Sequence, residues 1–138
     1  MNNMKQSIYF LADGNCRQVM EFYHQVFGGN LSMTTVGDSP AKDFMPPNFQ
    51  NKIINARLRS EVVDISASDW LMPQQQRVAG NSLCFYLNGG TFDGMKSIFE
   101  QLSIGGEVTD PIKEEFYGVY GALNDQFGNR WMLVIEKK

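Results

Sequence analysis

The amino-acid sequence predicts an α+β fold in which a strand–helix–strand–strand–strand (βαβββ) module occurs twice within a single domain, residues 1–138. Three repeated features support this prediction: an apolar strand end with an Asx-Gly turn, a helix with one apolar face, and a double glycine after the helix. The first strand end and turn occupy residues 10–14, and the second occupy residues 85–89. All three features recur in the same order, which makes a chance match improbable.

Apolar residues spaced three and four apart form one face of a helix in each module. They are Val19, Phe22, Tyr23, Val26 and Phe27 in the first module, and Met95, Ile98, Phe99 and Leu102 in the second. The pairs Gly28-Gly29 and Gly105-Gly106 follow these segments. Glycine adopts the left-handed conformation at little cost, so each pair is expected to end its helix.

Strand-like runs complete each module after its helix. They cover residues 31–36, 53–59 and 62–67 in the first module, and residues 107–109, 118–124 and 130–136 in the second. The modules therefore span about residues 5–70 and 81–136. A stretch that contains Pro and Gln, residues 70–80, joins them.

A long loop at residues 37–52, rich in Pro, Asp and Asn, interrupts the first module. It carries three large apolar side chains, Phe44, Met45 and Phe49. Long loops of this kind often act as lids or partner surfaces. Packing over a sheet edge is the alternative, and the sequence leaves both open.

The composition is that of an ordinary globular protein, with 43% hydrophobic and 20% charged residues. A net charge of −3 argues against nucleic acid as a partner. No apolar run approaches the ~18–20 residues that a membrane span needs, so we expect no membrane partner. The polar N-terminal residues predict no signal peptide, and two cysteines, Cys16 and Cys84, are typical of reduced thiols in the cytoplasm.

Alternation along residues 53–59 separates an apolar face from a polar face that carries Asn55 and Arg57. If Ser60 and Glu61 form a two-residue turn, Arg57 lies directly opposite Asp64 and Asn55 opposite Ser66. The same alternation separates Ser82, Cys84 and Tyr86 from Leu83, Phe85 and Leu87. We expect the polar sets of several strands to converge on one concave surface.

Five segments together resemble one protein family. They are Asp13-Gly14-Asn15-Cys16, residues 21–29, Gly37-Asp38-Ser39-Pro40, Asp43-Phe44-Met45-Pro46-Pro47 and residues 125–131. In this order they are similar to the PhnB-like proteins of the vicinal oxygen chelate superfamily, which includes glyoxalase I, bleomycin-resistance proteins and extradiol dioxygenases. The resemblance implies two βαβββ modules that form a curved mixed sheet around a pocket, commonly in a homodimer.

The resemblance also implies where a divalent metal would bind. The family's ligand positions fall at Ser7 or Ile8, Asn55, Ser82 and Met132. The transition metals used by such proteins prefer imidazole, carboxylate or thiolate ligands, so we expect no metal and no cofactor. The only histidine, His24, is expected on a helix surface. No histidine lies on the strand of Cys84 to activate it as a nucleophile.

Three functions remain open from the sequence. The first is a metal-free protein that binds a small molecule. Its expected pocket residues are Asn55, Arg57, Asp64, Ser66, Ser82, Tyr86, Tyr120 and Met132, under a lid of Phe44, Met45 and Phe49. The second is a metal-independent enzyme, such as a lyase or isomerase, in which Arg57 stabilises an anion and Asp64 or a tyrosine moves a proton. The third is an interaction module without a ligand. The missing metal ligands favour the first function over catalysis.

Overall fold

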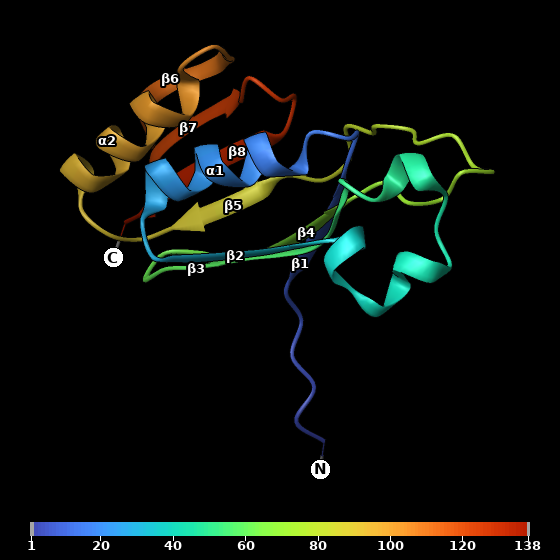
Figure 1. Ribbon diagram of the computed structural model, residues 1–138. Coiled ribbons are helices and arrows are strands. Elements are labelled where there is room, and N and C mark those ends of the chain that lie inside the picture. Colours follow the sequence, from blue (N-terminus) through green and yellow to red (C-terminus); the bar gives the residue numbers. More distant parts are fainter. Residues whose placement is uncertain (1, 138) are drawn as a thin grey trace. The chain divides into compact units, whose positions relative to one another are not determined.

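A computed structural model describes residues 2–137 of the chain (Figure 1). The chain divides into two compact units, of which the first ends at Val78 and the second begins at Ala79. In the described residues, no helix has both the length and the apolar character needed to cross a membrane.

The first unit is a βαβββ module with three short 3-10 turns inserted before its third strand. Its elements are β1 (Ile8–Ala12), α1 (Cys16–Phe27), β2 (Asn30–Thr35), the turns Val36–Asp38, Pro40–Asp43 and Pro47–Phe49, β3 (Ile53–Arg59) and β4 (Asp64–Asp69). The strands form a four-stranded sheet in the order β1-β4-β3-β2. Strands β1 and β4 run parallel, and the other pairs are antiparallel.

The second unit repeats this topology. Its elements are β5 (Phe85–Asn88), α2 (Phe92–Ser103), β6 (Glu107–Glu115), β7 (Gly118–Asn124) and β8 (Arg130–Glu136). The sheet order is β5-β8-β7-β6, with β5 and β8 parallel. The structure therefore confirms the α+β class and the βαβββ module that the sequence predicts twice.

The core of the first unit lies between α1 and its sheet. Val19, Met20 and Tyr23 of the helix are buried, as are Ala56 and Leu58 of β3. Burying side chains of this size removes apolar surface from water, at about 25 cal/mol for each Å². The predicted apolar face of β3 is thus largely correct, although Ile53 is buried and Ile54 only half-buried because the β2–β3 register shifts near Thr35.

A buried carboxylate, Asp69 at the end of β4, joins helix to sheet in the first unit. One of its oxygens accepts the backbone N–H of Cys16 at 2.9 Å, and the other accepts that of Ile53 at 2.8 Å. The first N–H groups of a helix lack partners within the helix, so Asp69 satisfies one that would otherwise be buried unpaired. Burial, and then the nearby charge of Asp69, raise the pKa of the Cys16 thiol to about 12.

The core of the second unit lies between α2 and strands β7 and β8. Phe99 and Leu102 of the helix are buried, as are Leu123 and Trp131 of the sheet. Gly121 lets the helix approach closely, because an added Cβ there would lie 2.8 Å from the ring of Phe99. Trp131 is fully buried in this core.

The predicted hairpin register between β3 and β4 is wrong by two residues. Arg59 pairs with Asp64 and Arg57 with Ser66, around a four-residue loop closed by the bond from Ser60 N–H to the Val63 carbonyl at 2.9 Å. The Ser60 hydroxyl stabilises this loop by accepting the N–H groups of Val62 and Val63, each at 3.0 Å. A shift of two residues preserves alternation, so the paired residues 56–59 and 64–67 keep their predicted faces.

The predicted strand at residues 107–109 is too short, since β6 continues to Glu115. Proline at position 111 cannot donate a backbone hydrogen bond, so a sequence pattern favours ending the strand before it. Strand β6 lies at the edge of its sheet, and its pairing with β7 shifts register on both sides of Asp110. An edge strand with such irregular pairing tolerates proline.

Candidate functional site

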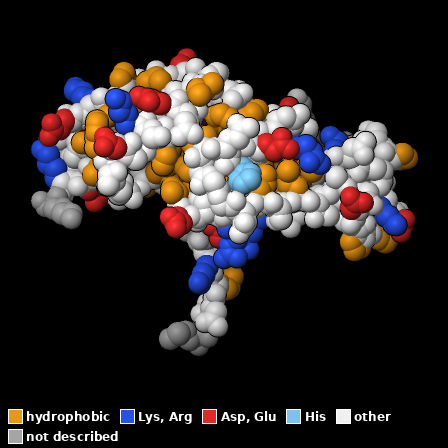
Figure 2. Space-filling view, turned by 60° about the vertical axis from the view of Figure 1, so that its left-hand side comes forward, with side chains coloured by type: hydrophobic (Ala, Val, Ile, Leu, Met, Phe, Trp, Pro, Cys, Tyr) orange, Lys and Arg blue, Asp and Glu red, His pale blue; other side chains and the backbone are white. Residues whose placement is uncertain are grey.

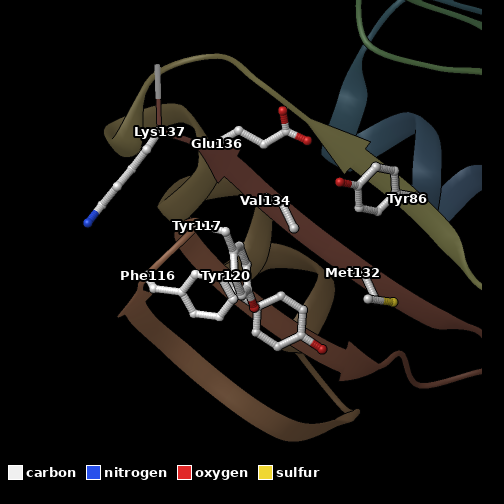
Figure 3. A pocket seen from close by; sticks show the side chains of 8 residues that line it. All are labelled: Tyr86, Phe116, Tyr117, Tyr120, Met132, Val134, Glu136 and Lys137. Atoms are coloured by element: carbon white, nitrogen blue, oxygen red, sulfur yellow. The ribbon is translucent and has the colours of Figure 1, made fainter.

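A cavity of about 700 Å³ lies in the second unit (Figure 3). Its walls are Tyr86, Phe116, Tyr117, Tyr120, Met132, Val134, Glu136 and Lys137. The cavity opens on the sheet face opposite α2, because Tyr120 and Val134 alternate with Gly121 and Leu133, which face the helix.

Strand pairing brings residues that are distant in sequence to this face. Tyr86 of β5 lies beside Met132 of β8, and Tyr120 of β7 lies beside Val134. The turn between β6 and β7 adds Phe116 and Tyr117, and the bond from Lys137 N–H to the Tyr117 carbonyl, 2.8 Å, holds it against the end of β8.

The aromatic rings of the cavity contact one another edge to face. The ring centroids of Tyr117 and Tyr120 are 6.4 Å apart at 74°, and those of Phe116 and Tyr117 are 5.0 Å apart at 88°. Such pairs stabilise a fixed arrangement of rings. Phe116 is nevertheless 87% exposed and Tyr86 53% exposed, so apolar surface stays available to a ligand.

The polar groups of the cavity are phenol hydroxyls, one carboxylate and one amine. The Glu136 carboxylate accepts a hydrogen bond from the Asn88 side chain at 3.2 Å. Desolvation, and then the charge of Glu115, raise the pKa of the Tyr117 hydroxyl above its ordinary value. Tyr117 is therefore a hydrogen-bond donor at neutral pH rather than a phenolate.

The expected pocket residues fall into two groups, one in each unit. Tyr86, Tyr120 and Met132 line the cavity of the second unit. Asn55 and Arg57 lie on β3 and Asp64 and Ser66 on β4, all in the first unit. Ser82 is exposed in the segment before β5 rather than on a strand.

Arg57 and Asp64 form a bidentate ion pair. The guanidinium contacts both carboxylate oxygens, at 3.0 and 2.9 Å, and Arg59 lies 3.9 Å from the same carboxylate. The hydrogen bond from Arg57 lowers the pKa of Asp64. The expected ion pair thus exists, but diagonally across the hairpin. At 44% and 43% exposure, this pair contributes little to stability.

Of the expected lid residues, Phe49 ends the third 3-10 turn, and Phe44 and Met45 lie between the second turn and the third. Phe44 is 85% exposed, whereas Met45 and Phe49 are half-buried. The side-chain amide of Gln50 donates to the carbonyls of Lys42 at 3.0 Å and Met45 at 3.3 Å. This loop is therefore an ordered segment with one protruding aromatic ring.

The family's metal positions do not fit a metal in this chain. Ile8 offers no donor atom, Ser7 and Ser82 offer only hydroxyls, and Asn55 offers a neutral amide; these three residues are exposed. The Met132 thioether contacts the Cys84 thiol at 3.3 Å. Within residues 2–137, no group of three or more His, Cys, Asp or Glu side chains is placed to hold a metal ion.

Five cavity residues were not expected from the sequence: Phe116, Tyr117, Val134, Glu136 and Lys137. Strand alternation could have found two of them, because residues 134 and 136 share a face with Met132. The aromatic pair before Gly118 is a further signal, since it directly follows β6, which extends to Glu115.

Comparison with known proteins places the chain in a family. No family model and no curated protein matches the sequence. Among solved structures, protein PA1353 from Pseudomonas aeruginosa is 31% identical, with a TM-score of 0.84 over 98% of this chain and 100% of that one. A PhnB protein from Bacillus cereus, described as a putative 3-demethylubiquinone-9 3-methyltransferase, is 16% identical, with a TM-score of 0.72 over 96% of this chain and 99% of that one.

A third structure, the antibiotic binding protein TnmS3 from Streptomyces, is 15% identical, with a TM-score of 0.57 over 99% of this chain and 100% of that one. The matched structures include members of the glyoxalase/bleomycin-resistance/dioxygenase fold. The fold, the repeated module and the relative that matches along its whole length lead to one conclusion: the chain belongs to one family with protein PA1353 and has the glyoxalase/bleomycin-resistance/dioxygenase fold, which the PhnB protein shares.

Proposed function

We propose that this chain is a metal-free, small-molecule-binding protein of the glyoxalase/bleomycin-resistance type, and that its ligand occupies the cavity lined by Tyr86, Tyr117 and Tyr120. The cavity itself carries the proposal. Its volume of about 700 Å³ lies within the range of about 300–1,000 Å³ typical of ligand sites. Apolar walls with a few polar groups are also typical of such sites.

The chemistry of the walls suits an organic molecule with an aromatic or bulky apolar body. Phenol rings and a thioether provide polarisable contact surfaces, and the hydroxyls can orient a ligand. TnmS3, named as an antibiotic binding protein, supports ligand binding as a use of this fold. The interspersed acidic and basic side chains on the face in Figure 2 also favour a small molecule over nucleic acid as the partner.

Binding has more support than metal-independent catalysis. The Arg57 guanidinium that would stabilise an anion is already paired with Asp64 on both carboxylate oxygens. Tyr117, the cavity tyrosine with a raised pKa, is a poor general base because its hydroxyl holds its proton at neutral pH.

The cytoplasm is our proposed compartment, supported by the free thiols of Cys16 and Cys84.

Soluble aromatic probes such as indole and 2-naphthol are expected to shift the methyl NMR signal of Met132, because a ring in the cavity adds its ring current there. Tyr120→Leu should weaken this binding about threefold to tenfold through the loss of one aromatic contact. Tyr9→Leu is the matched control, since Tyr9 is a half-exposed tyrosine on β1 of the first unit. Shifts confined to the exposed Met4 and Met72 would contradict the proposal.

We also propose that the chain forms a homodimer. Each sheet ends in two edge strands, and unpaired edges favour pairing or covering. Large apolar side chains are exposed as well: Met72, Val78, Leu83, Ile104 and Phe116. Light scattering at micromolar concentration is expected to give twice the chain mass of 15.6 kDa. A single-chain mass would refute the dimer, whose interface should bury upwards of ~1,000 Å².

A further inference from the structure

The charged groups of the cavity are placed unequally around its aromatic rings. Glu136 projects from the same face of β8 as Met132 and Val134, so its carboxylate belongs to the cavity wall. Lys137 comes at the strand end, and Figure 3 shows its amine pointing away from the rings. The charge that a ligand between the rings would meet is therefore the carboxylate.

Two cations of the same sheet, one on β6 and one on β8, already pair with carboxylates. Lys113 lies 3.8 Å from Glu115, and Arg130 lies 3.2 Å from Asp110. Glu136 instead contacts a neutral amide, that of Asn88, and no ion pair of Glu136 occurs among residues 2–137. Its negative charge is thus left for a ligand to balance.

Aromatic rings and a carboxylate select the same kind of ligand. The face of an aromatic ring carries a partial negative charge and attracts cations, and cages of several rings are the usual site for quaternary ammonium groups. The raised pKa of Tyr117, caused by desolvation and then by Glu115, is consistent with negative surroundings. An anionic ligand would be repelled by the same groups.

We infer that the ligand of this cavity is an organic cation, in which a quaternary ammonium or protonated amine is attached to an apolar body. The inference rests on the proposed binding function and adds the charge of the ligand. The rings of Tyr86, Tyr117 and Tyr120 would contact the cationic end, and Glu136 would balance its charge.

Three probes that share a benzyl group test the inference: benzyltrimethylammonium, its uncharged isostere neopentylbenzene, and the anion phenylmethanesulfonate. Binding is followed by the Met132 methyl signal, with each probe below its solubility limit. The cation is expected to bind about fivefold to thirtyfold more tightly than the isostere, the range for a cation among aromatic rings. The sulfonate should bind most weakly.

Glu136→Gln should weaken binding of the cation about threefold to fivefold and leave the isostere unchanged, because it removes charge but little volume. Glu114→Gln is the matched control, an exposed carboxylate of β6 outside the cavity, and should change neither. Equal affinity for cation and isostere, or tightest binding of the sulfonate, would overturn the charge assignment alone. If no probe shifts Met132, the binding function fails with it.

Discussion

Replacing Gly118 with alanine is expected to lower the free energy of unfolding by about 3–5 kcal/mol, an effect large enough to require a named structural cause. Gly118 begins β7 with φ at 146°, a backbone conformation that is strained for any residue with a Cβ. An added Cβ would also collide with the carbonyl oxygen of Ile135 and lie 2.9 Å from the Cα of Glu136. These atoms are backbone, so no side-chain rotation relieves the contact.

Two other glycines separate the causes of this effect. Gly80 has open space around it and no positive φ, so its alanine variant should change stability by less than about 0.5 kcal/mol. Gly90 has φ at 79° with open space, so its variant should cost about 1–2 kcal/mol through backbone strain alone. Urea denaturation of the three variants measures the series. Equal losses at positions 90 and 118 would show that β7 and β8 move apart easily.

Replacing Asp125 with alanine is expected to destabilise the protein by about 4 kcal/mol. Its carboxylate is buried and accepts hydrogen bonds from Phe127 N–H at 2.9 Å, from Asn129 N–H at 3.0 Å and from the Trp131 indole at 3.0 Å. Each bond to a charged acceptor contributes about 1.5–3 kcal/mol, and buried donors left without an acceptor add a penalty. The Trp131 indole, at the centre of the second core, would lose this acceptor.

The variant Asp125→Asn separates the contribution of the two backbone hydrogen bonds to stability from that of the indole hydrogen bond. An amide oxygen can still accept from the two backbone groups, but its NH₂ group would face the indole N–H of Trp131, donor to donor. We expect about half of the alanine effect, near 2 kcal/mol. Asp13→Ala, at an exposed turn of the first unit, should change stability by less than about 0.5 kcal/mol. Equal losses in the free energy of unfolding for Asp13→Ala and Asp125→Ala would mean that the hydrogen bonds of Asp125 make no specific contribution to stability.

The parts of the fold that could be predicted are those encoded locally. Strands β3, β7 and β8 have the predicted bounds, because an alternating pattern flanked by turn residues is visible in the sequence itself. The hairpin register was not encoded in this way. It depends on the Ser60 hydroxyl, which caps a four-residue loop where an Asn-Gly turn signal is absent.

The candidate site was predictable only where alternation alone decides it. Tyr86 and Met132 lie side by side because β5 pairs in parallel with β8. In the sequence these two strands are separated by α2, β6 and β7. Phe116 and Tyr117 enter the cavity only because β6 continues past Pro111. Long-range pairing and tolerance of proline at an edge depend on the assembled sheet, so neither is visible in a short window of sequence.

The two thiols of the chain differ in how a reagent can reach them. Cys16 is buried at the start of α1 in the first unit, and Cys84 is half-buried before β5 in the second. Alkylating reagents attack an accessible thiolate, so Cys84 can react in the folded chain, whereas Cys16 reacts after the first unit opens. The rate of Cys16 alkylation therefore reports how often the first unit opens, and the rate at Cys84 is the internal reference. The two native thiols thus allow local unfolding of one module to be measured without an introduced label.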